Sequence, residues 1–326
     1  MTNIVKQVFW CIVTMISISN QCIGQGKCLI VSDIHFNPFY STFNNCIVAI
    51  DTQLVRILGK QPVARWGAIL DQYYAGKKEI DLGRHDTNYP LLQSSIQSMK
   101  RHEKDISFIV IAGDFIWHES HDPKSPDTII RKCILKLKTM QFIAKVFRDS
   151  FPDVPVIPAL GNNDSDRGDY AEQSSVFLKG FAGAWNLNEK IDTALFNKEG
   201  YYSYKTVKYH DLKLIVLNSR LISYGTKDSS YYDKGEIMLH DWLKNELTDT
   251  TKNVWVISLM PAGQNGYALL NKKSYVEMWN PEQSQGFGNT VIKLYMERHY
   301  HHNHYLYYKP LLPHSMRRLV SVCLSG

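Results

Sequence analysis

Apolar runs return along the chain at the spacing that a layered α/β protein requires. Each run is four to eight residues long and is followed by polar or turn residues; the runs lie at 28–32, 108–113, 154–161, 212–218 and 254–260. Continuous apolar runs of this length are typical of strands that are buried on both faces of a sheet. Between them, helical patterns cover 91–102, 129–149 and 235–248. Alternating strands and helices predict α/β layers with catalytic residues at the carboxyl ends of the strands.

The pattern changes from about Pro281 onward. Residues 281–326 carry short apolar patches, clustered His and Tyr residues and nearby prolines, and they do not predict a strand, a turn and a closing strand. We therefore predict one catalytic domain over 25–280 and an atypical C-terminal tail over 281–326. A frame change in the coding sequence is an alternative origin for this tail.

The first residues have the composition of an export signal. Lys6 gives a positive start, an apolar stretch runs from Val8 to about Ser19, and small or polar residues follow up to Gly24. The stretch is shorter than the about 20 apolar residues that span a membrane. We predict a signal peptide over 1–24, no transmembrane span in the mature chain, and a secreted or periplasmic location. A retained N-terminal anchor or an uncleaved strand is the alternative.

Composition narrows the function classes only a little. The 37 Lys and Arg against 31 Asp and Glu give a net charge of +6, which favours anionic substrates weakly and gives no sign of nucleic-acid recognition. The six cysteines, at 11, 22, 28, 46, 133 and 323, form no CxxC pair. Export would allow some of them to oxidise, whereas Cys28 also fits a small buried thiol. A Ser or Cys hydrolase has little support, because GxSxG and an evident Cys–His pair are absent.

Side chains that bind divalent metal ions follow three of the apolar runs, namely Asp33 and His35, Asp114, and Asn162, Asn163 and Asp164. Residues two apart beyond a strand can point the same way, so Asp33 and His35 can share an ion. Asp114 could bridge two ions, and Asn162 could give the second ion a carbonyl oxygen. One Asp at a strand end is more often a turn residue or a helix cap. Three such ends in this order instead predict a two-metal site that activates water and clamps a phosphoryl group.

These motifs resemble those of the calcineurin-like metallophosphoesterases, in the acid sphingomyelinase-like branch. VSDIHFNPFY at 31–40 is similar to that branch's D-x-H-x-D-P-x-Y, and 82–100 is similar to its segment between the first two metal strands. The segments 112–120 and 200–219 extend the resemblance, which covers roughly 27–280. It implies a four-layer α/β/β/α sandwich of two mixed sheets, here with an incomplete C-terminal part.

Residue by residue, the resemblance implies that Asp33 and His35 hold the first metal, Asp114 bridges the two ions and Asn162 holds the second. His118 falls where this branch keeps a histidine beside the phosphate; a surface-loop histidine is the alternative. The family implies two divalent ions, and Zn, Mn or Fe all suit mixed Asp, His and Asn ligands.

Two positions depart from the family pattern within its motifs. The usual GNH(D/E) becomes GNND, so Asn163 stands where many members place the histidine that protonates the leaving group, while Asp164 keeps the acidic partner. An amide cannot act as a general acid, and losing that group can cost about 10²–10⁴ in rate. GNND is nevertheless similar to the form in endopolyphosphatases and some bacterial relatives. Leu259 replaces the histidine of H-x-P-P-G that would hold the second metal, and an aliphatic side chain offers no lone pair.

The GHxH motif, which would give one histidine to each metal, is missing as such. His302 and His304 have the H-x-H spacing at about the right distance, although His301 takes the place of the glycine. They are candidate metal ligands, and a solvated His/Tyr tail is the alternative.

Two hypotheses about function therefore follow from the sequence. The first is an exported metal-dependent phosphoesterase that hydrolyses phosphodiester or phosphoanhydride bonds through a metal-activated water, with His118, Asn163 and Asp164 beside the ions. Its substrate would be a phosphorylated small molecule, a lipid headgroup or polyphosphate. The second is a catalytically impaired pseudoenzyme or a truncated relative without a complete second metal site, which Leu259 favours.

Overall fold

The computed structural model describes the residues 27–43, 47–76, 86–118, 133–206, 212–222, 234–235, 237–249, 251, 253–259, 269–270, 273–274, 292–297, 304–306 and 318–323. The predicted signal peptide over 1–24 lies outside these ranges and stays a prediction. Within them, no helix combines the length and the apolarity that crossing a membrane requires.

Four parallel strands form the first sheet, in the order β13, β1, β4 and β5; they span Arg318–Cys323 (β13), Lys27–Ser32 (β1), Ile106–Ile111 (β4) and Val156–Pro158 (β5). β1 and β4 are mostly buried, which explains why their apolar runs are continuous and not alternating. Cys28 in β1 is a free thiol, and burial raises its pKa. It is therefore the small buried thiol that its apolar run allowed.

The second sheet has five strands in the order β12, β11, β8, β7 and β6; they span His304–Leu306 (β12), Ile292–Glu297 (β11), Asn253–Ile257 (β8), Leu212–Val216 (β7) and Tyr202–Lys205 (β6). β7, β8 and β11 run parallel, whereas β6 and β12 are antiparallel to their neighbours. Two short antiparallel pairs complete the described strands, Tyr40–Phe43 (β2) with Ile47–Ile50 (β3) and Leu269–Leu270 (β9) with Lys273–Ser274 (β10).

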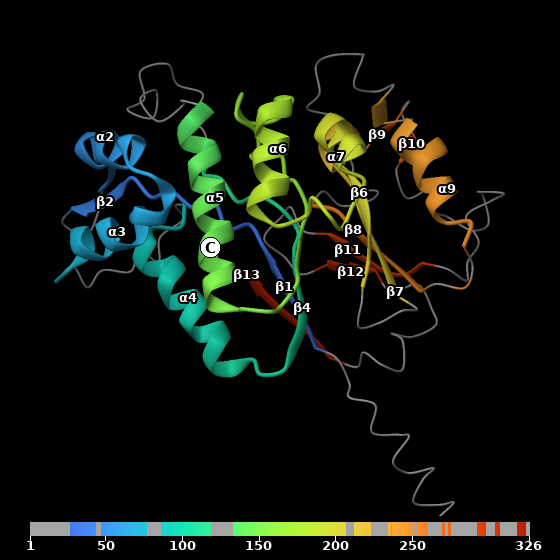
Figure 1. The fold of residues 1–326 in the computed structure, drawn as a ribbon, viewed down its shortest axis with the longest axis horizontal. Coiled ribbons are helices and arrows are strands. Elements are labelled where there is room, and N and C mark those ends of the chain that lie inside the picture. Colours follow the sequence, from blue (N-terminus) through green and yellow to red (C-terminus); the bar gives the residue numbers. More distant parts are fainter. Residues whose placement is uncertain are drawn as a thin grey trace, which may run out of the picture.

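Helices connect the strands and cover the sheets. They span Thr52–Lys60 (α2), Trp66–Tyr74 (α3), Tyr89–His102 (α4), Cys133–Ser150 (α5), Ser175–Ala184 (α6), Thr193–Glu199 (α7) and Lys244–Glu246 (α9). Short 3₁₀-helices lie at Val63–Arg65 and Ser219–Ile222, and a π-helix lies at Ile237–Leu243. The predicted helical patterns thus correspond to α4, α5 and the stretch that ends in α9. Figure 1 shows α4, α5 and α6 beside the strands of the first sheet, and α5 packs against both α4 and α6.

The two sheets contact each other through large side chains. The rings of Phe108 on β4 and Trp255 on β8 lie 5.8 Å apart, and the Tyr202 hydroxyl on β6 donates to the Pro158 carbonyl on β5 at 2.7 Å. Phe108, Trp255 and Tyr202 belong to the buried core. The α/β fold with two sheets is thereby confirmed, while the stacking into four layers stays a prediction.

Two expectations about the fold need correction. The segment 281–326, in which the pattern predicts no closing strands, contains β11, β12 and β13. The sequence IKLYME of β11 alternates apolar and polar residues, a two-residue period that the prediction did not use, and β11 and β13 pair with the buried strands β8 and β1. Both sheets were also expected to be mixed; the described strands of the second are mixed, whereas the four described strands of the first all run parallel.

Candidate metal centre

The main chains that leave β1 and β4 stay joined beyond the strands, and this brings the first candidates together. Asp33 N donates to Gly113 O at 3.1 Å, and His35 N donates to Asp114 O at 2.9 Å. Asp33, His35 and Asp114 have φ angles of 50°, 40° and 55°, in the left-handed region that residues other than glycine rarely adopt. Strained backbone of this kind clusters at functional sites. Three such residues at adjacent strand ends therefore indicate a site.

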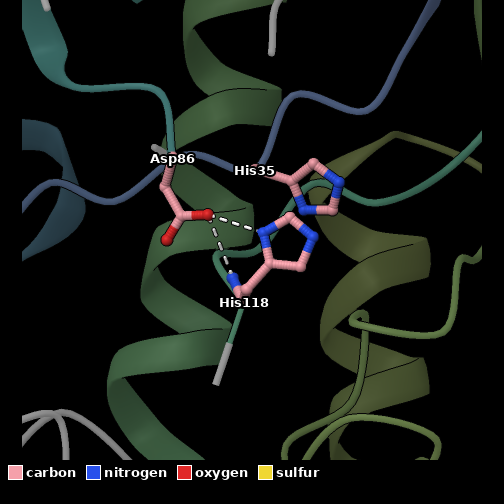
Figure 2. A group of neighbouring side chains, drawn as sticks. All are labelled: His35, Asp86 and His118. Atoms are coloured by element: carbon pink, nitrogen blue, oxygen red, sulfur yellow. Dashed lines mark hydrogen bonds and ion pairs between the residues drawn. The ribbon is translucent and has the colours of Figure 1, made fainter. Parts of the chain in front are cut away.

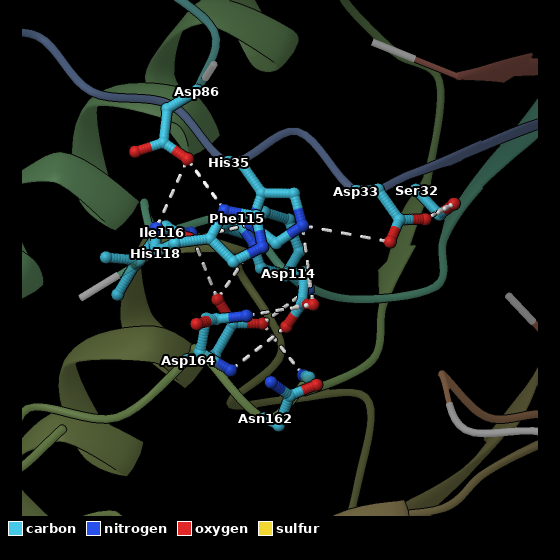
Figure 3. Close-up of polar contacts among 12 residues, drawn as sticks. Ser32, Asp33, His35, Asp86, Asp114, Phe115, Ile116, His118, Asn162 and Asp164 are labelled. Carbon is cyan, nitrogen blue, oxygen red and sulfur yellow. Dashed lines mark hydrogen bonds and ion pairs between the residues drawn. The ribbon is translucent and has the colours of Figure 1, made fainter. Parts of the chain in front are cut away.

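The side chains of Asp33, His35 and Asp114 meet in one buried cluster, as Figure 3 shows. His35 Nε2 lies 3.8 Å from Asp33 Oδ1 and 3.5 Å from Asp114 Oδ2. His35 Nδ1 lies 3.2 Å from the carbonyl oxygen of Ile116, which can only accept a hydrogen bond. In the neutral imidazole the proton therefore sits on Nδ1, and Nε2 offers its lone pair toward the carboxylates.

The charge of this cluster favours a cation. Burial lowers the pKa of His35, but the carboxylates of Asp114, Asp33 and Asp86 outweigh burial and raise the pKa to about 9. The carboxylates that hold a proton on the imidazole would equally attract a divalent ion, whose binding displaces that proton. Ser32 Oγ donates to Asp33 Oδ2, so a neighbouring hydroxyl also fixes this carboxylate.

Asn162 adds an unpaired amide oxygen to the site. The residue is 4% exposed, its Nδ2 donates to Asp169 Oδ1 at 2.7 Å, and its Oδ1 is buried without a hydrogen-bond partner. Leaving a buried acceptor unsatisfied costs about 1–3 kcal/mol. An ion at Oδ1 would remove this cost, so the orphaned oxygen fits the predicted role of Asn162 as a metal ligand.

Asn163 holds the carboxylate of Asp114. Its backbone N donates to Asp114 Oδ1 at 3.0 Å, and its side-chain Nδ2 donates to Asp114 Oδ2 at 3.1 Å. Both oxygens of the predicted bridging ligand are thus oriented by one neighbour. The amide is not acidic enough to protonate a leaving group, so the role of Asn163 that these contacts support is to orient Asp114.

Asp164 fastens the loops after β4 and β5 to each other. It is fully buried, and its carboxylate accepts hydrogen bonds from four backbone N–H groups, those of Asp114, Gly161, Phe115 and Ile116. Burial and the Asp114 carboxylate raise the pKa of Asp164 and the backbone donors lower it, with a result of about 7. A carboxylate occupied in this way contacts no substrate in this conformation, so its contribution is to hold the ligand loops.

Two glycines allow these loops to approach. Gly113 has a φ of 119°, and a Cβ there would lie 2.7 Å from Gly161 N. A Cβ on Gly161 would overlap Oδ1 of Asp114. The glycine that precedes each ligand segment is therefore required by close packing of the two loops.

His118 lies beside His35 and Asp86, as Figure 2 shows. Its ring stacks on the ring of His35 with centroids 3.8 Å apart. Its Nδ1 lies 2.7 Å from Asp86 Oδ1, and its backbone N donates to the same oxygen at 3.3 Å. The His118 side chain is 54% exposed, whereas that of Asp86 is 4% exposed. The structure thus places His118 at the rim of the buried cluster, within reach of solvent.

One position that the resemblance gives to a ligand is occupied by Leu259, and the side chains of His302 and His304 lie outside the part of the chain that the structure describes. Leu259 follows β8 and is fully buried, so an apolar side chain occupies the position that the family gives to a histidine. His302 lies outside the described residues. His304 begins β12 opposite Glu297, the last residue of β11, and only its backbone is described. Metal binding by His302 and His304 stays a prediction.

Two acidic residues of the site are not among the sequence candidates. Asp86 lies inside the segment 82–100 that carries part of the family resemblance, and this is the signal that could have pointed to it. Asp169 follows a polar stretch without periodicity, so no pattern marks it. Both act through hydrogen bonds to other side chains, which only the folded loops reveal.

Comparison with known proteins finds a matching family and several relatives of the chain. The sequence profile of the family described as calcineurin-like phosphoesterase matches residues 26–299. The human acid sphingomyelinase-like phosphodiesterase 3b is 27% identical over 286 residues, 84% of this chain and 54% of that protein. Sphingomyelinase phosphodiesterase C of Dictyostelium discoideum is 26% identical over 244 residues, 69% and 50% of the two chains. A human cyclic GMP-AMP phosphodiesterase is 28% identical over 184 residues, 55% and 39%.

The chain spans about half the length of the curated relatives that it matches. The family profile nevertheless extends from before β1 to beyond β11 and includes the strand ends that carry Asp33, His35, Asp114 and Asn162. Profile, relatives and the two-sheet α/β fold agree with one another. The chain belongs to the calcineurin-like phosphoesterase family, in its acid sphingomyelinase-like branch.

Proposed function

We propose that this protein is an exported metal-dependent phosphoesterase that hydrolyses phosphodiester or phosphoanhydride bonds. The observation that carries the proposal is the buried cluster of Asp33, His35 and Asp114 together with the unpaired Oδ1 of Asn162. Carboxylates, an imidazole and an amide oxygen form a ligand set that Zn, Mn or Fe can use. The family is metal-dependent, and relatives named as phosphodiesterases support the phosphodiester class.

In this proposal the ligands divide between two ions. Asp33 and His35 would hold the first, Asn162 the second, and Asp114 would lie between them. When bound, such ions lower the pKa of water and neutralise charge on the phosphoryl oxygens. Asn163 keeps Asp114 in one orientation through its two N–H groups, so the bridging position is fixed before an ion arrives.

In this proposal His118 would contact the substrate and not a metal ion. Because the Asp86 carboxylate can only accept, Nδ1 of this imidazole donates to it, and in the imidazolium form Nε2 can also donate a hydrogen bond or a proton to a phosphoryl or leaving oxygen. The half-exposed ring stacks on His35, so a group bound to it would be next to the metal cluster. Asn163 cannot supply this proton, and His118 is therefore our candidate for the general acid.

The substrate class and the location belong to the proposal as well. A phosphorylated small molecule, a lipid headgroup or polyphosphate would each present a phosphoryl group of the required kind. The GNND form favours no one of them on its own. The start of the chain, with Lys6 before an apolar stretch, supports export, which N-terminal sequencing of the protein secreted by an expressing cell would test.

The alternative is a pseudoenzyme with a single metal ion. Its support is the fully buried Leu259, which supplies no lone pair where the family has a histidine for the second ion. A chain that holds one ion through Asp33, His35 and Asp114 would keep the scaffold and bind phosphate without turning it over.

Metal analysis by inductively coupled plasma mass spectrometry and hydrolysis of bis(p-nitrophenyl) phosphate would separate the two proposals. An enzyme should contain more than one metal per chain and show hydrolysis that Asp114→Asn abolishes. Asp149→Asn is the matched control, because this carboxylate lies 61% exposed on α5, away from the cluster. Less than one metal per chain, or hydrolysis that survives Asp114→Asn, would refute the enzyme. One metal without hydrolysis would favour the pseudoenzyme.

A further inference from the structure

The loop after β5 folds back and forms two hydrogen bonds with Asn162. Asn162 Nδ2 donates to Asp169 Oδ1 at 2.7 Å, and the Asn162 carbonyl accepts from Tyr170 N at 2.9 Å. One bond holds the side chain and the other holds the main chain. We call Asp169 and Tyr170 the Asn162 clamp.

The clamp decides which end of the Asn162 amide faces Asp169. A carboxylate offers acceptors only, so it binds the NH₂ end of an amide. A flipped amide would place two acceptor oxygens 2.7 Å apart, the distance that now separates Nδ2 from Asp169 Oδ1. The orientation seen here therefore directs Oδ1 away from Asp169, and this is the oxygen that is buried without a partner.

The backbone around Asp169 is held in an uncommon conformation by contacts from outside the loop. Gly168 and Tyr170, on either side, have φ angles of 123° and 55°. Arg220, which follows β7 in the second sheet and is 2% exposed, donates from Nε to the Tyr170 carbonyl at 2.9 Å. A residue in the short 3₁₀-helix Ser219–Ile222, which follows a strand of the other sheet, thus fixes the clamp, so its geometry exists before any ion binds.

We propose that Asp169 is a positioning residue that presents Oδ1 of Asn162 to a metal ion. The inference rests on the metal site that the proposed function uses, but not on the hydrolysis. Hydrogen-bond partners that orient a metal ligand typically change metal affinity or activity about 10–100-fold when they are removed. In this chain the partner acts on an amide, whose two ends differ completely as ligands.

Mn²⁺ titration of the full-length chain, with free Mn²⁺ counted by electron paramagnetic resonance, tests the proposal without a substrate. Asp169→Leu should weaken Mn²⁺ binding about 10–100-fold, because the amide loses its orientation. Asp169→Asn should restore most of the affinity, because its Oδ1 can still accept from Asn162 Nδ2. Asp166→Asn is the control: Asp166 binds Ser174 in the same loop without contacting Asn162, and we expect unchanged Mn²⁺ affinity.

A double-mutant cycle with Asn162→Ala distinguishes positioning from a general effect on the fold. If Asp169 acts through Asn162, adding Asp169→Leu to Asn162→Ala should weaken Mn²⁺ binding no further. Equal weakening in both backgrounds, no weakening at all, or a wild-type chain that binds no Mn²⁺ would overturn the proposal. If the double-mutant cycle gives the expected result but the chain hydrolyses no phosphodiester, the proposed function is refuted. The role of Asp169 in positioning Asn162 is then retained.

Discussion

At the scale of single residues, Leu259 limits the number of protein ligands that are available to the second ion. The side chain is fully buried after β8, at the position where the family resemblance calls for a histidine. We predict that Leu259→His raises the metal content per chain, because the imidazole would add a lone pair at the position where the resemblance places a ligand of the second ion. Metal analysis after gel filtration measures this, with Leu259→Met as a control of similar volume and circular dichroism as the check on folding. A folded histidine variant with wild-type metal content would contradict the prediction.

The pair of His118 and Asp86 allows a second prediction at this scale. His118→Ala should lower kcat about 10²–10⁴-fold, the usual contribution of a general acid. Asp86→Asn should lower it less, about 10-fold, because the amide oxygen still accepts from Nδ1 while the negative charge is lost. Metal content should stay unchanged in both variants. A loss of metal in Asp86→Asn would mean that Asp86 is itself a ligand, since it lies with His35 and His118 in a group that could hold an ion.

At the scale of elements, Asp164 joins the loops that follow β4 and β5. An Asn at this position has one acceptor oxygen, and its NH₂ group would face backbone donors that now bind a carboxylate oxygen. Each buried donor left unpaired costs about 1–3 kcal/mol. We predict that Asp164→Asn lowers the free energy of unfolding by at least this amount in urea titrations, while the exposed Asp149→Asn leaves it unchanged. An unaltered unfolding midpoint for Asp164→Asn would show that the loops do not depend on this carboxylate.

The elements also show how far the sequence predicts the site. Asp33, His35, Asp114 and Asn162 could be placed because each directly follows an apolar run, and such strand ends meet at one edge of the fold. Asp169 could not, because its role depends on a loop that turns back through left-handed residues. β13 could not be predicted either, because its order comes from parallel pairing with β1 at the other end of the chain, whereas the apolar and polar alternation of β11 was a local signal that the prediction did not use.

At the scale of the whole molecule, buried tyrosines should make the fold sensitive to alkali. Burial raises the pKa of Tyr202 well above the ordinary 10.0, and burial likewise raises the pKa of Tyr74 and Tyr89. Below the ordinary value both folded and unfolded chains keep the phenols neutral, so stability is unaffected. Above about pH 10 the unfolded chain loses these protons first, and stability falls by about 1.4 kcal/mol per pH unit for each such tyrosine. Urea unfolding between about pH 8 and about pH 11 measures the slope. Tyr202→Phe should reduce it, and an equal slope in that variant would contradict the assignment.

Metal binding should stabilise the whole fold, because the cluster gathers buried carboxylates that repel one another. Asp33 and Asp114 are 1% and 2% exposed, and Asp164 lies directly against Asp114. An ion that binds only the folded chain adds about 2.7 kcal/mol when its concentration is 100 times its Kd. In a chain of 326 residues each kcal/mol raises Tm by about 1–2 °C. We therefore predict a higher Tm in Mn²⁺ than in EDTA by differential scanning calorimetry, with the difference kept in Asp149→Asn and lost in Asp114→Asn. Equal Tm values in Mn²⁺ and EDTA for the wild-type chain would mean that the cluster holds no ion in solution, and that like charge at its centre is accommodated by the proton on His35.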